Sequence, residues 1–322
     1  MRQVVVGLDT SCYTTSAAAV TADGQVVASC RKLLPVKLGE RGLRQSEGVF
    51  IHVRQLPDRL EALREFIRGD EIVAVCASAR PRDEEESYMP VFQVGDAQAR
   101  GLAAMLGVPY FSSTHQRGHV AAAMVDSGIA PGDLLAVHLS GGTTELLSLR
   151  GEALTLLGGT LDLHAGQVVD RVGGALGLPF PAGPHLEELA LRGHAEARLP
   201  VSMEGGGLRC HLSGAESQAQ RWIASGALSA EDTAMEIYDL LARTVARMIL
   251  AGAAKTGIRQ VLIAGGVASS ALFRRLVTER IRKSDRGLRV CFGKPEYSGD
   301  NAVGTALIGA QKYRQMMENA RG

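Results

Sequence analysis

A pattern of three short β-rich segments followed by helices occurs twice in this chain, and it restricts the possible folds more than any other feature. The first three segments, separated by Thr/Ser and Asp-Gly turns, lie at residues 3–8, 14–20 and 25–30. The second three lie at residues 134–138, 144–149 and 153–157. Each group is typical of a β-meander. Because the unit is repeated, the sequence predicts a two-lobed α/β protein with a cleft between its lobes.

The remaining segments show helical periods or alternate between strand and helix. Residues 48–68 have a helical period, although Pro57 is expected to kink or split that helix. Strand and helix then alternate at 71–77, 96–107, 109–112 and 115–127. After the second meander, helices are expected at 164–176, 184–192, 214–224 and 230–254. The chain ends with a strand at 260–264, a helix at 269–283, a strand at 288–292 and a helix at 300–318.

The length of 322 residues is about twice that of a common domain and accommodates two lobes. We expect residues 1–113 and about 296–322 to form the N-terminal lobe. About 114–295 would form the C-terminal lobe, with a helical insertion.

Charge and cysteine content limit the classes of partner. With 35 basic and 34 acidic residues, the chain has no overall attraction for RNA or for an anionic membrane. An RNA partner would need a local basic cluster or another protein. Candidate clusters, which are equally explained as solvated helix faces, are Arg54, Arg59 and Arg64, and Arg274, Arg275, Arg280, Arg282 and Lys283. The five scattered cysteines indicate a reducing compartment, and no apolar run approaches the ~18 residues of a membrane span. We therefore expect a cytoplasmic protein with no membrane partner.

Four turns rich in small residues each follow a predicted strand. They lie at residues 7–15, 138–146, 180–189 and 263–270. Such turns leave backbone N–H groups free to face an anion, so together they predict a phosphate or nucleotide site, although any one of them alone is better explained as a simple turn. Asp162 and Asp170 lie between them, and a carboxylate there would bind a ribose hydroxyl or a metal-bound phosphate. Asp162 is explained equally well as part of a solvated helix face.

Two histidines, His115 and His119, lie four residues apart at the start of a predicted helix. This spacing places both imidazoles on one side of the helix, where they would bind one ion, but polar residues at a helix start give the same pattern. Asp300, in a turn before the final helix, is the candidate third ligand. Two imidazoles and one carboxylate suit zinc or Fe(II) with open positions. The glutamate that a zinc peptidase has after its first histidine is missing, which argues against proteolysis.

The order of the short motifs adds a resemblance to a known family. TSC at 10–12, HVRQLP at 52–57, HxxxH at 115–119 and SGGTTEL at 140–146 are followed by TLDLHAG at 160–166, PFPAGPHLEEL at 179–189, LSG at 212–214, AGGVA at 264–268 and SGDNAVG at 298–304. In this order and spacing, the chain resembles the bacterial TsaD family of tRNA threonylcarbamoyladenosine transferases, long labelled glycoprotease-like or O-sialoglycoprotein endopeptidase-like. The resemblance runs almost end to end.

The resemblance implies a fold, a reaction and a set of partners. The fold would be the two-lobed α/β superfold of actin, sugar kinases and chaperone ATPases, with a central cleft. The reaction would move a threonylcarbamoyl group from threonylcarbamoyl-adenylate to adenosine 37 of tRNA. Implied partners are a paralogue that forms a heterodimer and an ATPase subunit.

The resemblance also implies a role for individual residues. A divalent metal, iron or zinc, would be bound by His115, His119 and Asp300. Contacts with ATP or the adenylate would fall on Ser140, Gly141, Gly142, Thr143, Asp170, Gly183 and Ser270. No catalytic side chain is assigned.

Several positions depart from the family pattern. Two acidic residues near the phosphates are replaced by Tyr13 and Thr14, and a histidine by Thr143. Gln167 replaces a glutamate and Ser270 an asparagine. At neutral pH, the neutral side chains of Tyr13 and Thr14 cannot supply the base or metal-binding functions of carboxylates. A second hypothesis is therefore a non-catalytic or repurposed paralogue that binds nucleotide or a partner subunit.

Overall fold

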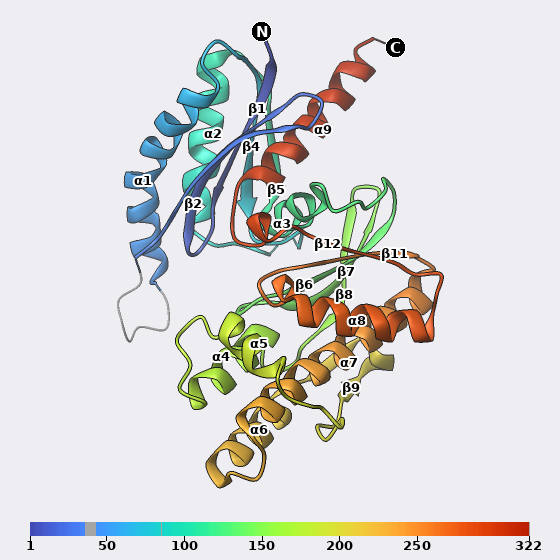
Figure 1. The fold of residues 1–322 in the computed structure, drawn as a ribbon. Helices are drawn as coiled ribbons and strands as arrows, with labels where there is room; N and C mark the ends of the chain where they lie inside the picture. Colours follow the sequence, from blue (N-terminus) through green and yellow to red (C-terminus); the bar gives the residue numbers. More distant parts are fainter. Residues whose placement is uncertain (36–42, 85, 322) are drawn as a thin grey trace. The chain divides into compact units, whose positions relative to one another are not determined.

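The computed structural model describes residues 1–35, 43–84 and 86–321 and divides into two compact units (Figure 1). Unit 1 comprises Met1–Ala123 and Gly299–Gly322, and unit 2 comprises Met124–Ser298. The chain leaves unit 1 about ten residues later than the expected boundary near residue 113. The reason is a close contact, since a Cβ on Gly304 would lie 1.8 Å from the Gly118 carbonyl oxygen. The helix that carries His115 and His119 therefore packs within unit 1.

Unit 1 is a mixed sheet with helices on both faces. Its strands are β1 (Gln3–Thr10), β2 (Thr14–Thr21), β3 (Val26–Leu33), β4 (Glu71–Arg80) and β5 (Tyr110–Thr114). Their order is β3-β2-β1-β4-β5, with antiparallel pairing in the first meander and parallel pairing of β1, β4 and β5. Its helices are α1 (Gln45–Phe66), α2 (Phe92–Leu106), α3 (His115–Met124) and α9 (Val303–Asn319).

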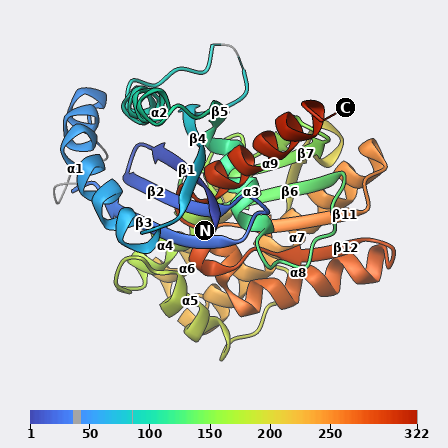
Figure 2. The ribbon, with the colours of Figure 1, turned by 90° about the horizontal axis from the view of Figure 1, so that it is seen from above.

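Alternation along β1 divides the core of unit 1 into two layers. Val4, Val6 and Leu8 pack with residues of α1 and α2, whereas Val5 packs with Ala306 of α9. Successive strand residues face opposite sides, so both faces of this strand are buried. Figure 2 shows the result, with α1 and α2 on one side of the sheet and α9 on the other.

Unit 2 repeats the topology of unit 1. Its sheet contains β6 (Leu134–Leu139), β7 (Thr144–Arg150), β8 (Ala153–Gly159), β11 (Gln260–Ala264) and β12 (Arg289–Phe292). The order β12-β11-β6-β7-β8 matches that of unit 1 strand for strand, again with an antiparallel meander and parallel neighbours. Its helices are α4 (Ala165–Ala175), α5 (Gly183–Ala190), α6 (Ser213–Ser225), α7 (Ala230–Thr256) and α8 (Ala271–Ser284). The predicted repeat of the meander is confirmed.

Two local features differ from the sequence-based expectation. A hairpin of β9 (Ser202–Glu204) and β10 (Arg209–His211) lies between the helices predicted at 184–192 and 214–224, where no element was predicted. Strands of three residues are too short to show an alternating pattern. Helix α1 continues through Pro57 without a break. Proline has no N–H to donate to the carbonyl of Val53, and both residues are exposed, so that side of the helix faces solvent.

Among the described residues, no helix is long and apolar enough to cross a membrane.

We predict that Gly7→Ala destabilises unit 1. A Cβ at Gly7 would lie 2.5 Å from the Ala306 nitrogen and 2.7 Å from the Ala302 oxygen, so α9 would have to move away from β1. We expect a loss of about 1–3 kcal/mol in the free energy of unfolding, measured by urea denaturation followed by circular dichroism. The matched control is Gly101→Ala in α2, where a Cβ meets nothing within 4 Å and should raise stability by about 0.5–1 kcal/mol. Equal stability of the two variants would contradict this account of the packing.

Candidate functional site

Unit 1 brings the two histidines and the late aspartate together. His115 and His119 lie in the first turns of α3, and Asp300 lies in the turn before α9. His119 Nε2 is 3.0 Å from His115 Nε2 and 3.3 Å from Asp300 Oδ1. His115 Nε2 is 3.6 Å from the same oxygen. Three ligand atoms from distant parts of the chain thus converge within 4.8 Å of one another.

These distances fit a bound metal ion. With bonds of ~2.0–2.2 Å, ligand atoms around one ion lie about 3 to 3.6 Å apart in octahedral or tetrahedral geometry. The three observed separations span that range. The donor set of two imidazoles and a carboxylate suits zinc or iron. The residues present therefore fit a divalent metal.

A fourth residue, Asp9 at the end of β1, was missed by the sequence analysis. Its Oδ2 accepts a hydrogen bond of 2.9 Å from His115 Nδ1, so the other ring nitrogen, Nε2, faces Asp300. A carboxylate behind a histidine is a common arrangement in metal sites, where it fixes the tautomer and the ring orientation. Asp9 is 1% exposed, and its Oδ1 has no hydrogen-bond partner among the described residues. The only signal in the sequence was an acidic residue at the end of an apolar strand.

The charges in this cluster favour a cation. Burial disfavours the charged form of His115, but the neighbouring carboxylates of Asp9 and Asp300 outweigh burial and raise its pKa well above the usual value. Burial likewise opposes ionisation of Asp300, yet hydrogen bonds from His115 and His119 lower its pKa well below the usual range. The carboxylates that favour a protonated imidazole would attract a divalent cation equally well.

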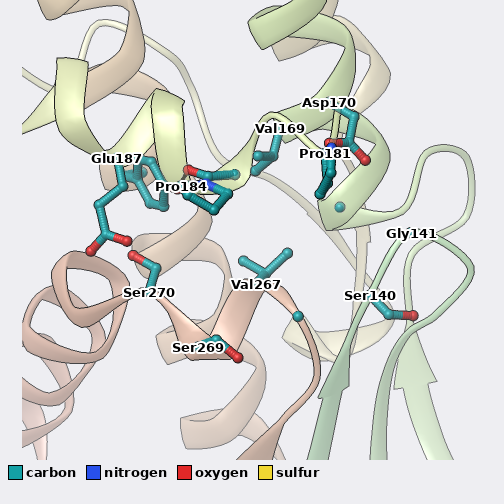
Figure 3. Close-up of a pocket in the computed structure, with 14 residues that line it drawn as sticks. Ser140, Gly141, Val169, Asp170, Pro181, Pro184, Glu187, Val267, Ser269 and Ser270 are labelled. Carbon is teal, nitrogen blue, oxygen red and sulfur yellow. Dashed lines mark hydrogen bonds between the residues drawn. The ribbon is translucent and has the colours of Figure 1, made fainter. Parts of the chain in front are cut away.

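A second site lies wholly within unit 2, where three of the four predicted turns meet. A cavity of about 430 Å³ is lined by residues of the turns at 138–146, 180–189 and 263–270, together with α4 and α7 (Figure 3). The fourth turn, at 7–15, lies in unit 1, where it contributes Asp9 and Ser11 to the histidine cluster. Lining residues are Ser140, Gly141, Gly166, Val169, Asp170, Pro181, Gly183, Pro184, Glu187, Tyr238, Gly266, Val267, Ser269 and Ser270.

Most of the predicted nucleotide-binding residues line this cavity. Ser140, Gly141, Asp170, Gly183 and Ser270 do so, whereas Gly142 and Thr143, in the same turn as Ser140, are not among the described lining residues. The residues assigned one by one from the sequence leave out other lining residues, among them Glu187, from the turn at 180–189, and Tyr238 of α7. The Tyr238 hydroxyl donates to the Gly183 carbonyl, and a Glu187 carboxylate oxygen accepts from the Leu272 N–H at the start of α8.

Several polar residues near the cavity serve in local structure. Ser270 caps α8 by accepting from the Phe273 N–H, and Asp170 accepts from the Ala182 N–H. Gln167 accepts from the His164 N–H in a capping box at the start of α4. These side chains build the walls of the cavity by fixing the helix ends.

Asp162 is not among the described lining residues of the cavity, and it lies before α4 and not on a helix face. Its carboxylate accepts hydrogen bonds from the N–H groups of Leu212 and Ser213 and from the Ser213 hydroxyl. Burial opposes ionisation of Asp162, but these hydrogen bonds outweigh it and lower its pKa. It therefore caps the start of α6, where a negative charge also complements the helix dipole.

A close approach of two backbones holds the turn at Ser140 in place. A Cβ on Gly166, in the first turn of α4, would lie 2.6 Å from both the Gly141 nitrogen and the Ser140 carbonyl carbon. The Gly166 N–H also donates to the Ser140 oxygen at 3.0 Å. Glycine at this position allows the start of α4 and the turn to form one side of the cavity.

The structure separates the basic residues that are bound internally from those at the surface. Arg274 donates to the carbonyls of Ala268 and Gly293, and Arg280 pairs with Asp239. Both therefore hold α8 in place. The exposed basic side chains of the α8 cluster are Arg275, Arg282 and Lys283.

Comparison with known proteins shows the family of this chain. The family model for tRNA N6-adenosine threonylcarbamoyltransferase, TsaD, matches residues 88–307. A relative of that name from Thermus thermophilus is 33% identical over 322 residues, covering 98% of this chain and 94% of the relative. A relative of the same name from Thermofilum pendens is 28% identical over 313 residues, covering 96% of this chain and 89% of the relative.

Solved structures show the same fold at low sequence identity. Full-length HypF in a phosphate- and nucleotide-bound form matches 96% of this chain and 55% of its own, with a TM-score of 0.64 and 11% identity. The match to a ROK family glucokinase from Streptomyces griseus in complex with glucose and AMPPNP covers 96% of this chain and 99% of the glucokinase chain, with a TM-score of 0.54 and 14% identity. The predicted superfold of actin and sugar kinases is confirmed. By its family model and its near-full-length relatives, the chain belongs to the TsaD family of transferases.

Proposed function

We propose that this protein transfers a threonylcarbamoyl group from threonylcarbamoyl-adenylate to adenosine 37 of tRNA, with the help of a divalent metal. The tRNA-modifying reaction is supported by the family model and by relatives named for this transfer. The observation that supports a metal-dependent reaction is the close approach of His115 Nε2, His119 Nε2 and Asp300 Oδ1 to one another.

The metal, iron or zinc, would be held by His115, His119 and Asp300. When bound, it would supply a Lewis acid that polarises a carbonyl or phosphoryl oxygen of the substrate. Asp9 fixes the His115 ring with Nε2 toward the other two ligands. Three protein ligands leave coordination positions for oxygen atoms of a substrate.

We propose that the unit 2 cavity binds the nucleotide part of ATP or of the adenylate. Its volume of about 430 Å³ lies within the usual range for small-molecule sites. The small residues of the turn at Ser140–Gly141 would let a phosphate group approach the backbone closely. Val169, Val267 and Tyr238 supply apolar surface for the nucleoside. Bound nucleotides in the structures of HypF and the ROK glucokinase support this assignment by analogy of fold.

Partners are proposed on the same basis. With a net charge of +1, binding of tRNA would depend on local basic side chains such as Arg275, Arg282 and Lys283 or on other proteins. We propose a paralogous heterodimer partner and an ATPase subunit, as the resemblance implies. The five free cysteines favour a reducing compartment, which we take to be the cytoplasm.

A specific observation supports the second hypothesis, that of a repurposed paralogue. Gln167 and Ser270, which replace family residues, use their side-chain oxygens to cap helices. Tyr13 is 47% exposed and Thr14 is buried at the start of β2, and neither carries a carboxylate. Expression in cells that lack their own transferase separates the two functions. Restored threonylcarbamoyladenosine in tRNA supports the enzyme, and its continued absence with soluble protein supports the paralogue.

We predict that His115→Ala and Asp300→Ala each abolish stoichiometric binding of zinc or iron, because two remaining ligands hold an ion poorly. Asp9→Asn should weaken metal affinity by about 10- to 100-fold, since the His115 ring loses a charged acceptor. Metal content is measured by elemental analysis, and transfer to tRNA by mass spectrometry with the partner proteins present. His211→Ala, a partly exposed histidine paired with Glu204 in unit 2, is the control and should retain the metal. A full equivalent of metal in His115→Ala would exclude this site.

We predict that Gly166→Ala weakens binding of a non-hydrolysable ATP analogue by at least about tenfold, or ~1.4 kcal/mol. The added methyl group pushes the turn at Ser140–Gly141 away from α4. Binding is measured by isothermal titration calorimetry. The control is Gly174→Ala on the same helix, where a Cβ meets nothing within 4 Å. If both variants bind the analogue like the wild type, the turn is not part of a nucleotide site.

A further inference from the structure

A buried histidine in α1 is bonded through one ring nitrogen to the turn between β1 and β2 and through the other to the start of β2. His52 is 0% exposed. Its Nδ1 lies 2.8 Å from the Thr15 hydroxyl, and its Nε2 lies 2.8 Å from the Ser11 carbonyl oxygen. This residue belongs to the HVRQLP motif, to which the proposed reaction assigns no role.

The chemistry of the Ser11 contact fixes the direction of that hydrogen bond. A carbonyl oxygen only accepts, so His52 Nε2 carries the proton and donates. Burial lowers the pKa of His52, which favours the neutral form of the ring. A neutral ring with its proton on Nε2 can donate to the Ser11 carbonyl, so this hydrogen bond does not require a positively charged histidine.

Ser11 connects this histidine to the metal-binding cluster. Its hydroxyl donates to Asp300 Oδ2 at 2.6 Å, and Ser11 itself is 2% exposed. The other oxygen of that carboxylate, Oδ1, is the atom near His115 and His119. Each oxygen of Asp300 thus has its own partners: Oδ2 accepts from the Ser11 hydroxyl, and Oδ1 lies near the two histidines.

We propose that His52 is a positioning residue for the metal site. It holds the Ser11 backbone, so that the Ser11 hydroxyl orients Asp300 with Oδ1 toward the two histidines. This inference rests on the metal site of the proposed function. It deepens that proposal by assigning a role to a side chain that does not itself reach the ligand atoms.

The pattern of contacts argues against a purely structural histidine. An apolar side chain of similar volume would fill this position in the core without needing any hydrogen bond. Instead, the ring donates to the turn between β1 and β2, a connection with no regular secondary structure at Ser11. That turn carries the residue bonded to Asp300.

The test compares two substitutions of His52 in the full-length protein by titration with Co²⁺. His52→Leu removes the donor to Ser11, and we expect Co²⁺ affinity to fall about 10- to 100-fold with altered visible absorption bands. His52→Gln keeps an N–H at a similar reach, and we expect affinity and spectrum close to those of the wild type. The spectrum reports the ligand geometry directly, so it does not depend on transfer activity.

Two further variants keep the test decisive. Ser11→Ala removes only the hydroxyl that bonds to Asp300 and should reproduce the effect of His52→Leu, also if His52→Leu fails to fold. Thr15→Val removes the hydroxyl that bonds to His52 Nδ1 but leaves the bond from Nε2 to Ser11. This variant should bind Co²⁺ like the wild type.

Unchanged affinity and spectrum in folded His52→Leu or in Ser11→Ala would overturn the proposal. An equally large loss in Thr15→Val would also overturn it, because general loosening of the core would then explain the effect. A wild-type protein that binds no Co²⁺ would refute the metal site itself, and this inference with it.

Discussion

The packing of α9 against β1 and α3 is the contact on which the unit 1 site depends. This last helix lies directly on Gly7 of β1 and on the Gly118 carbonyl of α3, and at both contacts a glycine permits the approach. Asp300 lies just before the helix, so the same packing brings its carboxylate to His115 and His119. Backbones this close leave no room for a methyl group, and the cluster is therefore positioned by sterics before any ion binds.

The repeated topology gives two sites of different chemistry at equivalent places. In unit 1, the turn after β1 carries Asp9 and Ser11, which bond to His115 and to Asp300. In unit 2, the turn after β6 carries Ser140 and Gly141 and lines an open cavity. Acidic and imidazole groups suit a cation in the first case. Small residues, which let a phosphate group approach the backbone closely, suit an anion in the second.

Residues that depart from the family pattern are explained unevenly by the structure. Gln167 and Ser270 act as helix caps, and this role stabilises the wall of the cavity. Nothing in the structure explains Tyr13, which is exposed in the turn between β1 and β2. The proposed metal ligands His115, His119 and Asp300 lie together, and Asp9 and Ser11 bond to them. Binding functions are thus better supported than the acid or base chemistry of transfer.

The sequence by itself determined the repeat, most of the strands and helices, and the pairing of His115 with His119, because these depend on local periodicity. It also pointed to Asp300 and to the turns that line the cavity, through the order of motifs along the chain. Only the tertiary structure assigned Asp9, Ser11 and His52 to one hydrogen-bonded group and Asp162 to the cap of α6. The spacing of residues along a chain does not specify which side chains meet across separate strands and helices. Those contacts are set by strand register and by the close approach of backbones at glycine.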